Sequence, residues 1–82
     1  MKSRREELRN YGIEIESSYF IYRREDKVIA VPYSHIRTIE LKEDTVIVYT
    51  GGIERLVIQL PHQGLALALF EDILLSIERL HL

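Results

Sequence analysis

The feature that most constrains the fold of this chain is the segment DTVIVYTGGIERLVIQL, residues 44–60. Two runs of apolar and β-branched residues, which favour extended strands, flank the pair Gly51-Gly52. Two glycines in succession suit a two-residue hairpin loop, because both central positions of such a loop require positive φ. The segment therefore predicts an antiparallel β-hairpin with Gly51-Gly52 at its tip.

The register of this predicted hairpin places apolar residues on both of its faces. A two-residue loop would put Thr50 opposite Ile53 and Val46 opposite Val57. One face suits a covering helix and contains Ile47, Leu56, Ile58 and Leu60. The second face contains Val46, Val48, Ile53 and Val57. Two interpretations remain open: the sheet coils into a small roll that turns the second face inward, against Phe20, Ile21 and Val31, or the second face binds another protein.

The segment from residue 12 to residue 60 predicts about six antiparallel strands joined by short turns. Residues 13–16 (IEIE) alternate, which is typical of a strand with one face in water, and residues 19–22 (YFIY) are apolar on both faces. The charged run at residues 23–27 (RREDK) indicates an exposed turn. The spacing of the isoleucines that follow predicts a helical turn or bulge at Ser34-His35 before the next strand.

Two helices are expected to flank these strands. A capping-box pattern that begins at Ser3 predicts a short N-terminal helix over residues 3–11, ended by Gly12. After Pro61 the apolar residues recur at helical spacing, which predicts a long helix over residues 63–81. A stripe centred on Phe70 is expected to pack on the sheet, and it contains Ala66, Leu67, Leu69, Ile73, Leu74, Ile77 and Leu80. Outside this stripe lie the apolar residues Ala68, Leu75 and Leu82.

Length and composition limit the classes of protein to which the chain can belong. With 82 residues, the chain is long enough for one domain, residues 1–82, and too short for two. A net charge of −2 gives no general attraction to nucleic acid or to an anionic membrane. The longest apolar run, residues 64–70, is far shorter than the ~18 residues that span a bilayer. We therefore expect a soluble, cytoplasmic protein without a membrane span.

Candidate catalytic and metal-binding residues are few. The chain has no cysteine, which excludes disulfides and thiolate metal sites. His35, His62 and His81 do not show the spacing of metal ligands. Gly51-Gly52 joins two strands instead of preceding a helix, so the pair does not form a phosphate-binding loop. We expect no enzymatic activity, no metal and no cofactor.

One basic cluster supports an alternative function. Arg23, Arg24 and Lys27 lie in the predicted turn at residues 23–27, beside the acidic pair Glu25-Asp26. Nearby aromatic residues could stack on nucleic-acid bases while the basic residues contact phosphate, although aromatic residues in strands are more often part of a core. The alternative prediction is a small nucleic-acid- or anion-binding protein that uses this turn.

The phrase VPYSHIRTIEL, followed by DTVIVYT, IERLVIQLP and LFEDILLSI, is similar to bacterial pleckstrin-homology-like domains over residues 12–80. This resemblance implies a strongly bent antiparallel sheet plugged at one end by a C-terminal helix, and a binding or assembly module rather than an enzyme. Phosphoinositide-binding members of that family have a basic loop between the first two strands, where this chain has Ser17-Ser18. A shorter likeness, HIRTIE followed by DTVIVYTGG, resembles the small flagellar-operon proteins of the FlbD type.

These observations predict an α+β domain: a strongly bent antiparallel sheet or small roll of about six strands, with a short N-terminal helix and a long C-terminal helix. The predicted function is that of a non-catalytic protein-interaction or assembly module that self-associates into a homo-oligomer through apolar sheet or helix surface. The candidate interaction residues are Val46, Val48, Ile53, Val57, Leu75 and Leu82.

Overall fold

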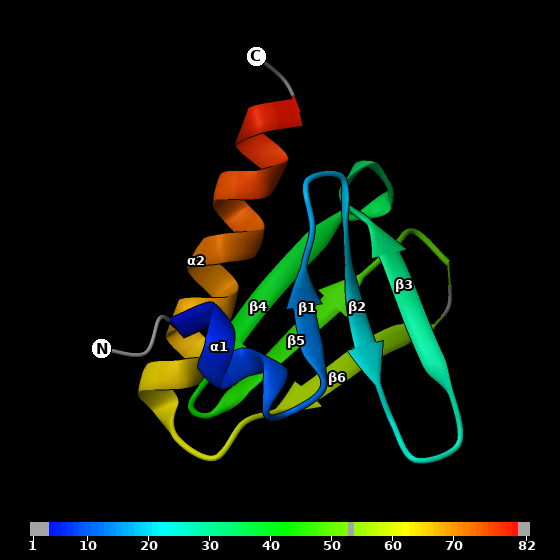
Figure 1. The fold of residues 1–82 in the computed structure, drawn as a ribbon. Helices are drawn as coiled ribbons and strands as arrows, with labels where there is room; N and C mark the ends of the chain where they lie inside the picture. The colour runs from blue at the N-terminus through cyan, green and yellow to red at the C-terminus, as the bar shows by residue number, and fades with distance from the viewer. Residues whose placement is uncertain (1–3, 53, 81–82) are drawn as a thin grey trace.

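Two three-stranded antiparallel sheets and one long helix make up the architecture of this chain (Figure 1). The structure is a computed structural model that describes residues 4–52 and 54–80. The first sheet contains β1 (Ile13–Ile15), β2 (Tyr19–Arg23) and β3 (Val28–Pro32), and the second contains β4 (Thr38–Lys42), β5 (Thr45–Tyr49) and β6 (Arg55–Gln59). The remaining elements are the short helix α1 (Arg4–Arg9), the 3₁₀ turn η1 (Tyr33–His35) between the sheets, and the long helix α2 (Gln63–Leu80). The predicted α+β class, with six antiparallel strands between a short and a long helix, is confirmed.

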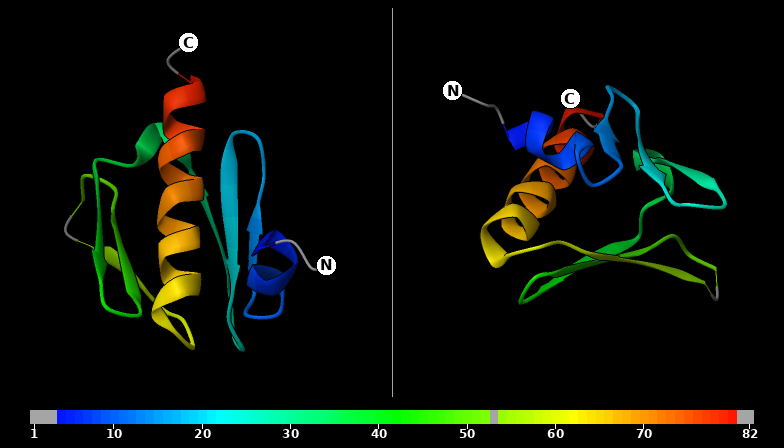
Figure 2. Two further views of the ribbon diagram at one scale, coloured as in Figure 1. Left: turned by 90° about the vertical axis from the view of Figure 1, so that its left-hand side faces the viewer. Right: turned by 60° about the horizontal axis from the view of Figure 1, so that its bottom comes forward.

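The two sheets lie on either side of α2, which covers one side of the space between them. Within each sheet, every strand pairs with the strand that precedes or follows it in the chain. Figure 2 shows one sheet on either side of α2, with β3 and the start of β6 on the side of the sheet pair away from the helix. The predicted helical turn at Ser34-His35 lies in η1, where the chain passes from the first sheet to the second.

Gly12 allows the chain to turn directly from α1 into β1. Its φ is +83°, and a Cβ atom at this position would lie 2.6 Å from the carbonyl oxygen of Arg23. The same two residues are hydrogen-bonded, since the Arg23 N–H donates to the Gly12 carbonyl at 2.8 Å. Only glycine combines this backbone conformation with so close an approach. The turn therefore places α1 beside the first sheet.

The loop between β5 and β6 is longer than the sequence predicts. The last paired residues are Tyr49 and Arg55, so the loop comprises residues 50–54. Gly51 has a φ of +89°, but Gly52 is not in the positive-φ region. The predicted two-residue loop is therefore wrong, and so is the predicted register, by one residue. Because side chains alternate along a strand, this difference reassigns the faces of β5.

The observed register turns two of the candidate interaction residues into the core. Val46 and Val48 are each 0% exposed. Val57 pairs with Ile47 on the outer face of the second sheet, and Val57 is 42% exposed. The prediction that the three valines share one face is therefore wrong. Val46 and Val48 of β5 do pack inward, as one of the two interpretations expected.

The core lies between the two sheets and α2. Leu8 of α1 and Ile13 of β1 close it on one side, and both are fully buried. Phe20 and Val31 belong to this core, whereas Ile21 lies on the opposite face of β2. The other buried core residues are Tyr33, Val46, Val48, Ile58, Leu60, Leu65, Ala66, Leu69 and Ile73.

The rotation of α2 about its own axis differs from the predicted one. Leu69 and Ile73 are 0% exposed, as predicted, and Ala68, which was expected outside the buried stripe, is 3% exposed. Leu67 and Leu74, expected to pack on the sheet, are 42% and 38% exposed. The buried side is centred near Leu69 rather than Phe70, because α1 packs on α2 near Ala68.

Several residues named in the sequence predictions lie outside the part of the chain that the structure describes. They are the capping residue Ser3, the candidate residues Ile53 and Leu82, and His81. Within residues 4–52 and 54–80, no helix combines the length and apolar character needed to cross a membrane.

Candidate interaction surface on the C-terminal helix

Exposed apolar side chains concentrate on α2. Half of the large apolar side chains that are exposed among the described residues belong to this helix, namely Leu67, Leu74, Leu75 and Leu80, while the others are Tyr11, Tyr19, Val28 and Val57. Single exposed leucines are ordinary on soluble proteins, but several on one helix form a surface with a potential for binding.

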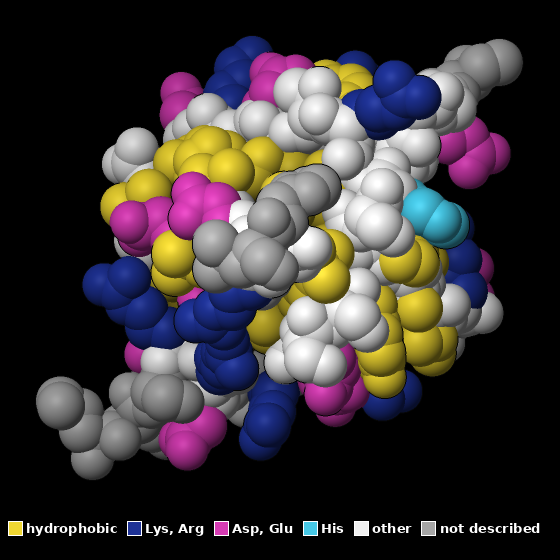
Figure 3. Space-filling view, turned by 90° about the horizontal axis from the view of Figure 1, so that it is seen from above, with side chains coloured by type: hydrophobic (Ala, Val, Ile, Leu, Met, Phe, Trp, Pro, Cys, Tyr) yellow, Lys and Arg dark blue, Asp and Glu magenta, His cyan; other side chains and the backbone are white. Residues whose placement is uncertain are grey.

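Four of the helix residues form a continuous row, which we call the α2 strip: Leu67, Phe70, Leu74 and Ile77. Successive members are three, four and three residues apart, so they share one side of the helix. Phe70 and Ile77 are half-buried and connect the exposed leucines to the core. Figure 3 shows hydrophobic side chains gathered along α2, on the side toward the β4–β6 sheet, with acidic side chains beside them.

Acidic residues border the α2 strip on the side away from β4. Glu71 and Glu78 are both exposed and lie one residue beyond Phe70 and Ile77 in the chain. Arg4 of α1 approaches Glu71 at 3.8 Å, but both side chains are more than half exposed, so the pair contributes little stability. The surface is thus an apolar row with a negative edge.

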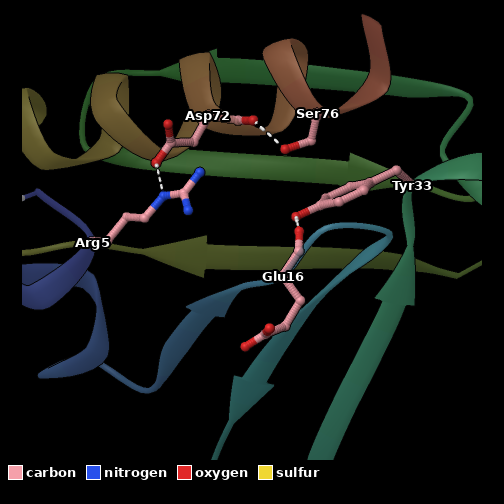
Figure 4. Close-up of polar contacts among 5 residues, drawn as sticks. All are labelled: Arg5, Glu16, Tyr33, Asp72 and Ser76. Carbon is pink, nitrogen blue, oxygen red and sulfur yellow. Dashed lines mark hydrogen bonds and ion pairs between the residues drawn. The ribbon is translucent and has the colours of Figure 1, made fainter. Parts of the chain in front are cut away.

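A polar cluster on the opposite side of α2 holds the helix in this rotation (Figure 4). The Tyr33 hydroxyl of η1 is buried and donates a hydrogen bond of 2.8 Å to the carbonyl oxygen of Glu16. Ser76, which is 4% exposed, donates to the Asp72 carbonyl at 2.8 Å. Burial raises the pKa of Tyr33, and the adjacent Ser76 hydroxyl partly offsets that increase.

The polar cluster connects α2 to α1, and its Tyr33 also contacts β2. Arg5 of α1 lies 3.8 Å from the Asp72 carboxylate, and the Tyr33 ring stacks on Phe20 of β2 with centroids 6.3 Å apart. Within the described residues, no buried side-chain nitrogen or oxygen lacks a hydrogen-bond partner. Since Ser76 and Asp72 must face these partners, Leu67 and Leu74 are left facing outward. The sequence signal for this arrangement was a serine within an otherwise apolar helical row.

The candidate interaction residues from the sequence therefore do not form one site. Val46 and Val48 belong to the core, and Val57 lies alone of the three on the outer face of β6. Leu75 is 48% exposed and lies outside the α2 strip, beside a hollow of about 490 Å³ that Arg4 and Arg5 also line.

The three basic residues of the alternative prediction, Arg23, Arg24 and Lys27, do not form one cluster. Arg23 pairs with the Glu14 carboxylate at 3.3 Å. The Arg24 guanidinium lies over the Tyr22 ring, 5.7 Å from its centroid. Lys27 lines a different hollow from the two arginines. A phosphate at this turn would compete with Glu14 for Arg23.

The described histidines lie apart from each other. His62 precedes α2, and its Nδ1 accepts a hydrogen bond of 3.2 Å from the Leu65 N–H, which caps the first turn of the helix. His35 ends η1 and lines the hollow that contains Lys27. In the part of the chain that the structure describes, no group of three or more His, Cys, Asp or Glu side chains could hold a metal ion.

Comparison with known proteins adds no relative. No family model matches the chain, and no curated protein and no solved structure matches it either. The likeness to pleckstrin-homology-like domains stays a prediction from the sequence.

Proposed function

We propose that this chain is a non-catalytic assembly module of the cytoplasm, and that two copies associate by packing their α2 strips against each other. The observation that carries this proposal is the exposure of Leu67 and Leu74, 42% and 38%, at positions that share one side of α2. A domain of this size buries only about 60 to 65% of the surface of its unfolded chain, so a partner adds stability that the core alone does not provide.

The spacing of the strip suits a second copy of the same helix. Separations of three and four residues are those of the a and d positions in helices that pack side by side. In an antiparallel pair related by a two-fold axis near Asp72, Leu67 meets Ile77 of the other copy and Phe70 meets Leu74. Every apolar member of the strip then has an apolar partner.

The acidic edge gives this association a distinctive dependence on salt. Antiparallel packing brings Glu71 and Glu78 of the two copies to the same edge of the interface, where like charges repel. Added salt screens exposed charges over distances beyond about 8 Å at physiological ionic strength, so it strengthens the dimer. Phosphate binding by the basic turn would show the opposite dependence, because salt weakens contacts between cations and phosphate. Ionic strength therefore separates the two predicted functions.

The test is a double substitution in the strip with a control on the same helix. Leu67→Glu combined with Leu74→Glu is expected to convert a dimer into a folded monomer, since unpaired charges are costly in a dry interface and harmless in water. Leu75→Glu adds charge at a position that is also exposed but lies outside the strip, and it should leave the dimer intact. Sedimentation equilibrium gives the mass, and circular dichroism confirms folding. A wild-type chain that stays monomeric at millimolar concentration would refute the proposal.

A further inference from the structure

The side of the molecule opposite α2 contains a cleft between the two sheets. It has a volume of about 350 Å³ and lies between β3 and the start of β6. Ile29 and Val31 of β3 and Leu56 of β6 provide apolar walls. Figure 2 shows β3 and the start of β6 on the side of the sheet pair away from α2. At this cleft, solvent reaches apolar side chains of both sheets.

β3 borders this cleft with a free edge. β2 is the only strand paired with β3 among the described residues. The Arg24 N–H donates to the Lys27 carbonyl at 2.8 Å, and the Tyr33 N–H donates to the Ser18 carbonyl at 3.0 Å. Since hydrogen-bonded pairs alternate along an antiparallel ladder, residues 27, 29, 31 and 33 direct their backbone groups to β2.

The intervening residues direct their backbone groups away from the sheet. Val28 and Ala30 each offer one N–H and one C=O at the free edge, and Pro32 offers only a C=O. Exposed backbone groups in this arrangement are the template on which another extended segment forms hydrogen bonds. An occupant with this chemistry is an extended polypeptide rather than a small molecule or a helix.

The mouth of the cleft has an excess of positive charge. Lys27 and Arg55 line it together with His35, against the single carboxylate of Glu54. Among the described residues, neither Lys27 nor Arg55 forms an ion pair with a carboxylate. The side chain of Lys27 points to the same face as Ile29, because side chains alternate along the extended chain. A carboxylate on the occupant would complement this charge.

We propose that the edge of β3 binds an extended segment of a partner protein, which adds to the first sheet as an antiparallel fourth strand. The side chains of the segment that face the cleft are apolar, except for an acidic residue at its C-terminal end, beside Lys27. A second copy of β3 is a poorer occupant, since antiparallel pairing about Ala30 would place Tyr33, not a carboxylate, opposite Lys27. This binding is separate from the proposed self-association and does not depend on it.

The test uses the peptide acetyl-Thr-Val-Thr-Val-Thr-Glu-amide, which places valines opposite Val31 and Ile29 and glutamate opposite Lys27. Titration followed by ¹⁵N nuclear magnetic resonance should shift the amide signals of Val28 and Ala30 most strongly. Shifts confined to other strands, or no shift at millimolar peptide, would overturn the proposal.

Two substitutions separate strand addition from nonspecific contact. Ala30→Pro removes an N–H that the ladder with β2 does not use, so the chain should stay folded while affinity for the peptide falls about tenfold or more. Val28→Thr keeps the backbone donor at the same edge and should bind like the wild type. Lys27→Glu should weaken binding of this peptide and restore binding of the version that ends in lysine. Equal affinity of the wild type and Ala30→Pro for the peptide would also contradict strand addition.

Discussion

The rotation of α2 can be tested by one chemical change made at two positions. Leu69→Ala and Leu74→Ala each shorten a leucine in the middle of the same helix, so they share any effect of helix propensity. They differ in environment, because Leu69 is 0% exposed and Leu74 is 38% exposed. The difference between the two unfolding free energies therefore reports which side of α2 faces the core.

The expected magnitudes follow from burial. Truncating leucine to alanine removes three carbon atoms, worth about 2.4 kcal/mol when they are fully buried, at about 0.8 kcal/mol per CH₂. At Leu69 the cavity that remains raises the cost to about 3 to 4 kcal/mol. At Leu74, about 60% of the side chain is buried, so truncation should cost about 60% of that transfer free energy, near 1.5 kcal/mol. Solvent fills the vacated space, so no cavity adds to this cost. We expect the two variants to differ by about 2 kcal/mol.

Urea titration followed by circular dichroism measures both costs. A domain of this size loses about 1 kcal/mol of stability per molar urea, so the midpoints of the two variants should differ by about 2 M. The protein must be dilute enough to be monomeric, because Leu74 also belongs to the α2 strip. Equal costs, or a larger cost for Leu74→Ala, would show that the helix presents the side centred on Phe70 to the sheets, and the α2 strip would then be buried.

Two further changes test the register of β5 and the polar cluster. Val48→Lys should unfold the chain, since it buries an unpaired charge. Val57→Lys lies on the outer face and should leave the circular dichroism spectrum and the thermal midpoint nearly unchanged. Equal effects of the two substitutions would support the register predicted from Gly51-Gly52, which places both valines on one face. Tyr33→Phe removes a buried hydroxyl donor and should lower the free energy of unfolding, measured by denaturant titration, by about 1 kcal/mol. A loss below a few tenths of a kcal/mol would show that the hydrogen bond to Glu16 contributes nothing. Because the pKa of Tyr33 is raised above its ordinary value of 10.0 in the folded chain, its contribution is complete below pH 10 and disappears as the pH rises through the folded pKa. The decline in stability above pH 10 should therefore be shallower in Tyr33→Phe, and identical pH profiles would contradict the raised pKa.

The strands and helices could be predicted because the spacing of apolar residues changes clearly at Gly12 and Pro61. The hairpin register could not, since one residue more or less in the loop exchanges the two faces of a strand, and Gly51-Gly52 is compatible with loops of several lengths. Of the two glycines only Gly51 has a positive φ, and the loop comprises residues 50–54.

The predicted rotation of α2 about its own axis was wrong for a different reason. The helix has apolar residues around most of its circumference, so periodicity alone leaves its rotation open. Contacts between Ser76 and Tyr33, and between Asp72 and Arg5, select one rotation. These pairs are distant in the sequence, and the individual residues do not reveal them. The α2 strip was missed because its leucines were assigned to the core.

The pairing of each strand only with its neighbours in the chain also bears on how the molecule folds. Each sheet can form from local hairpins, which lowers the loop-closure entropy of the early steps and favours rapid folding. α2 follows both sheets in the chain and contacts elements from α1 to β5, so its docking completes the most distant contacts. If this docking follows the transition state, substitutions on the buried side of α2 accelerate unfolding and leave the folding rate nearly unchanged. The lifetime of the folded chain is then controlled by its last helix, the same helix that displays the α2 strip.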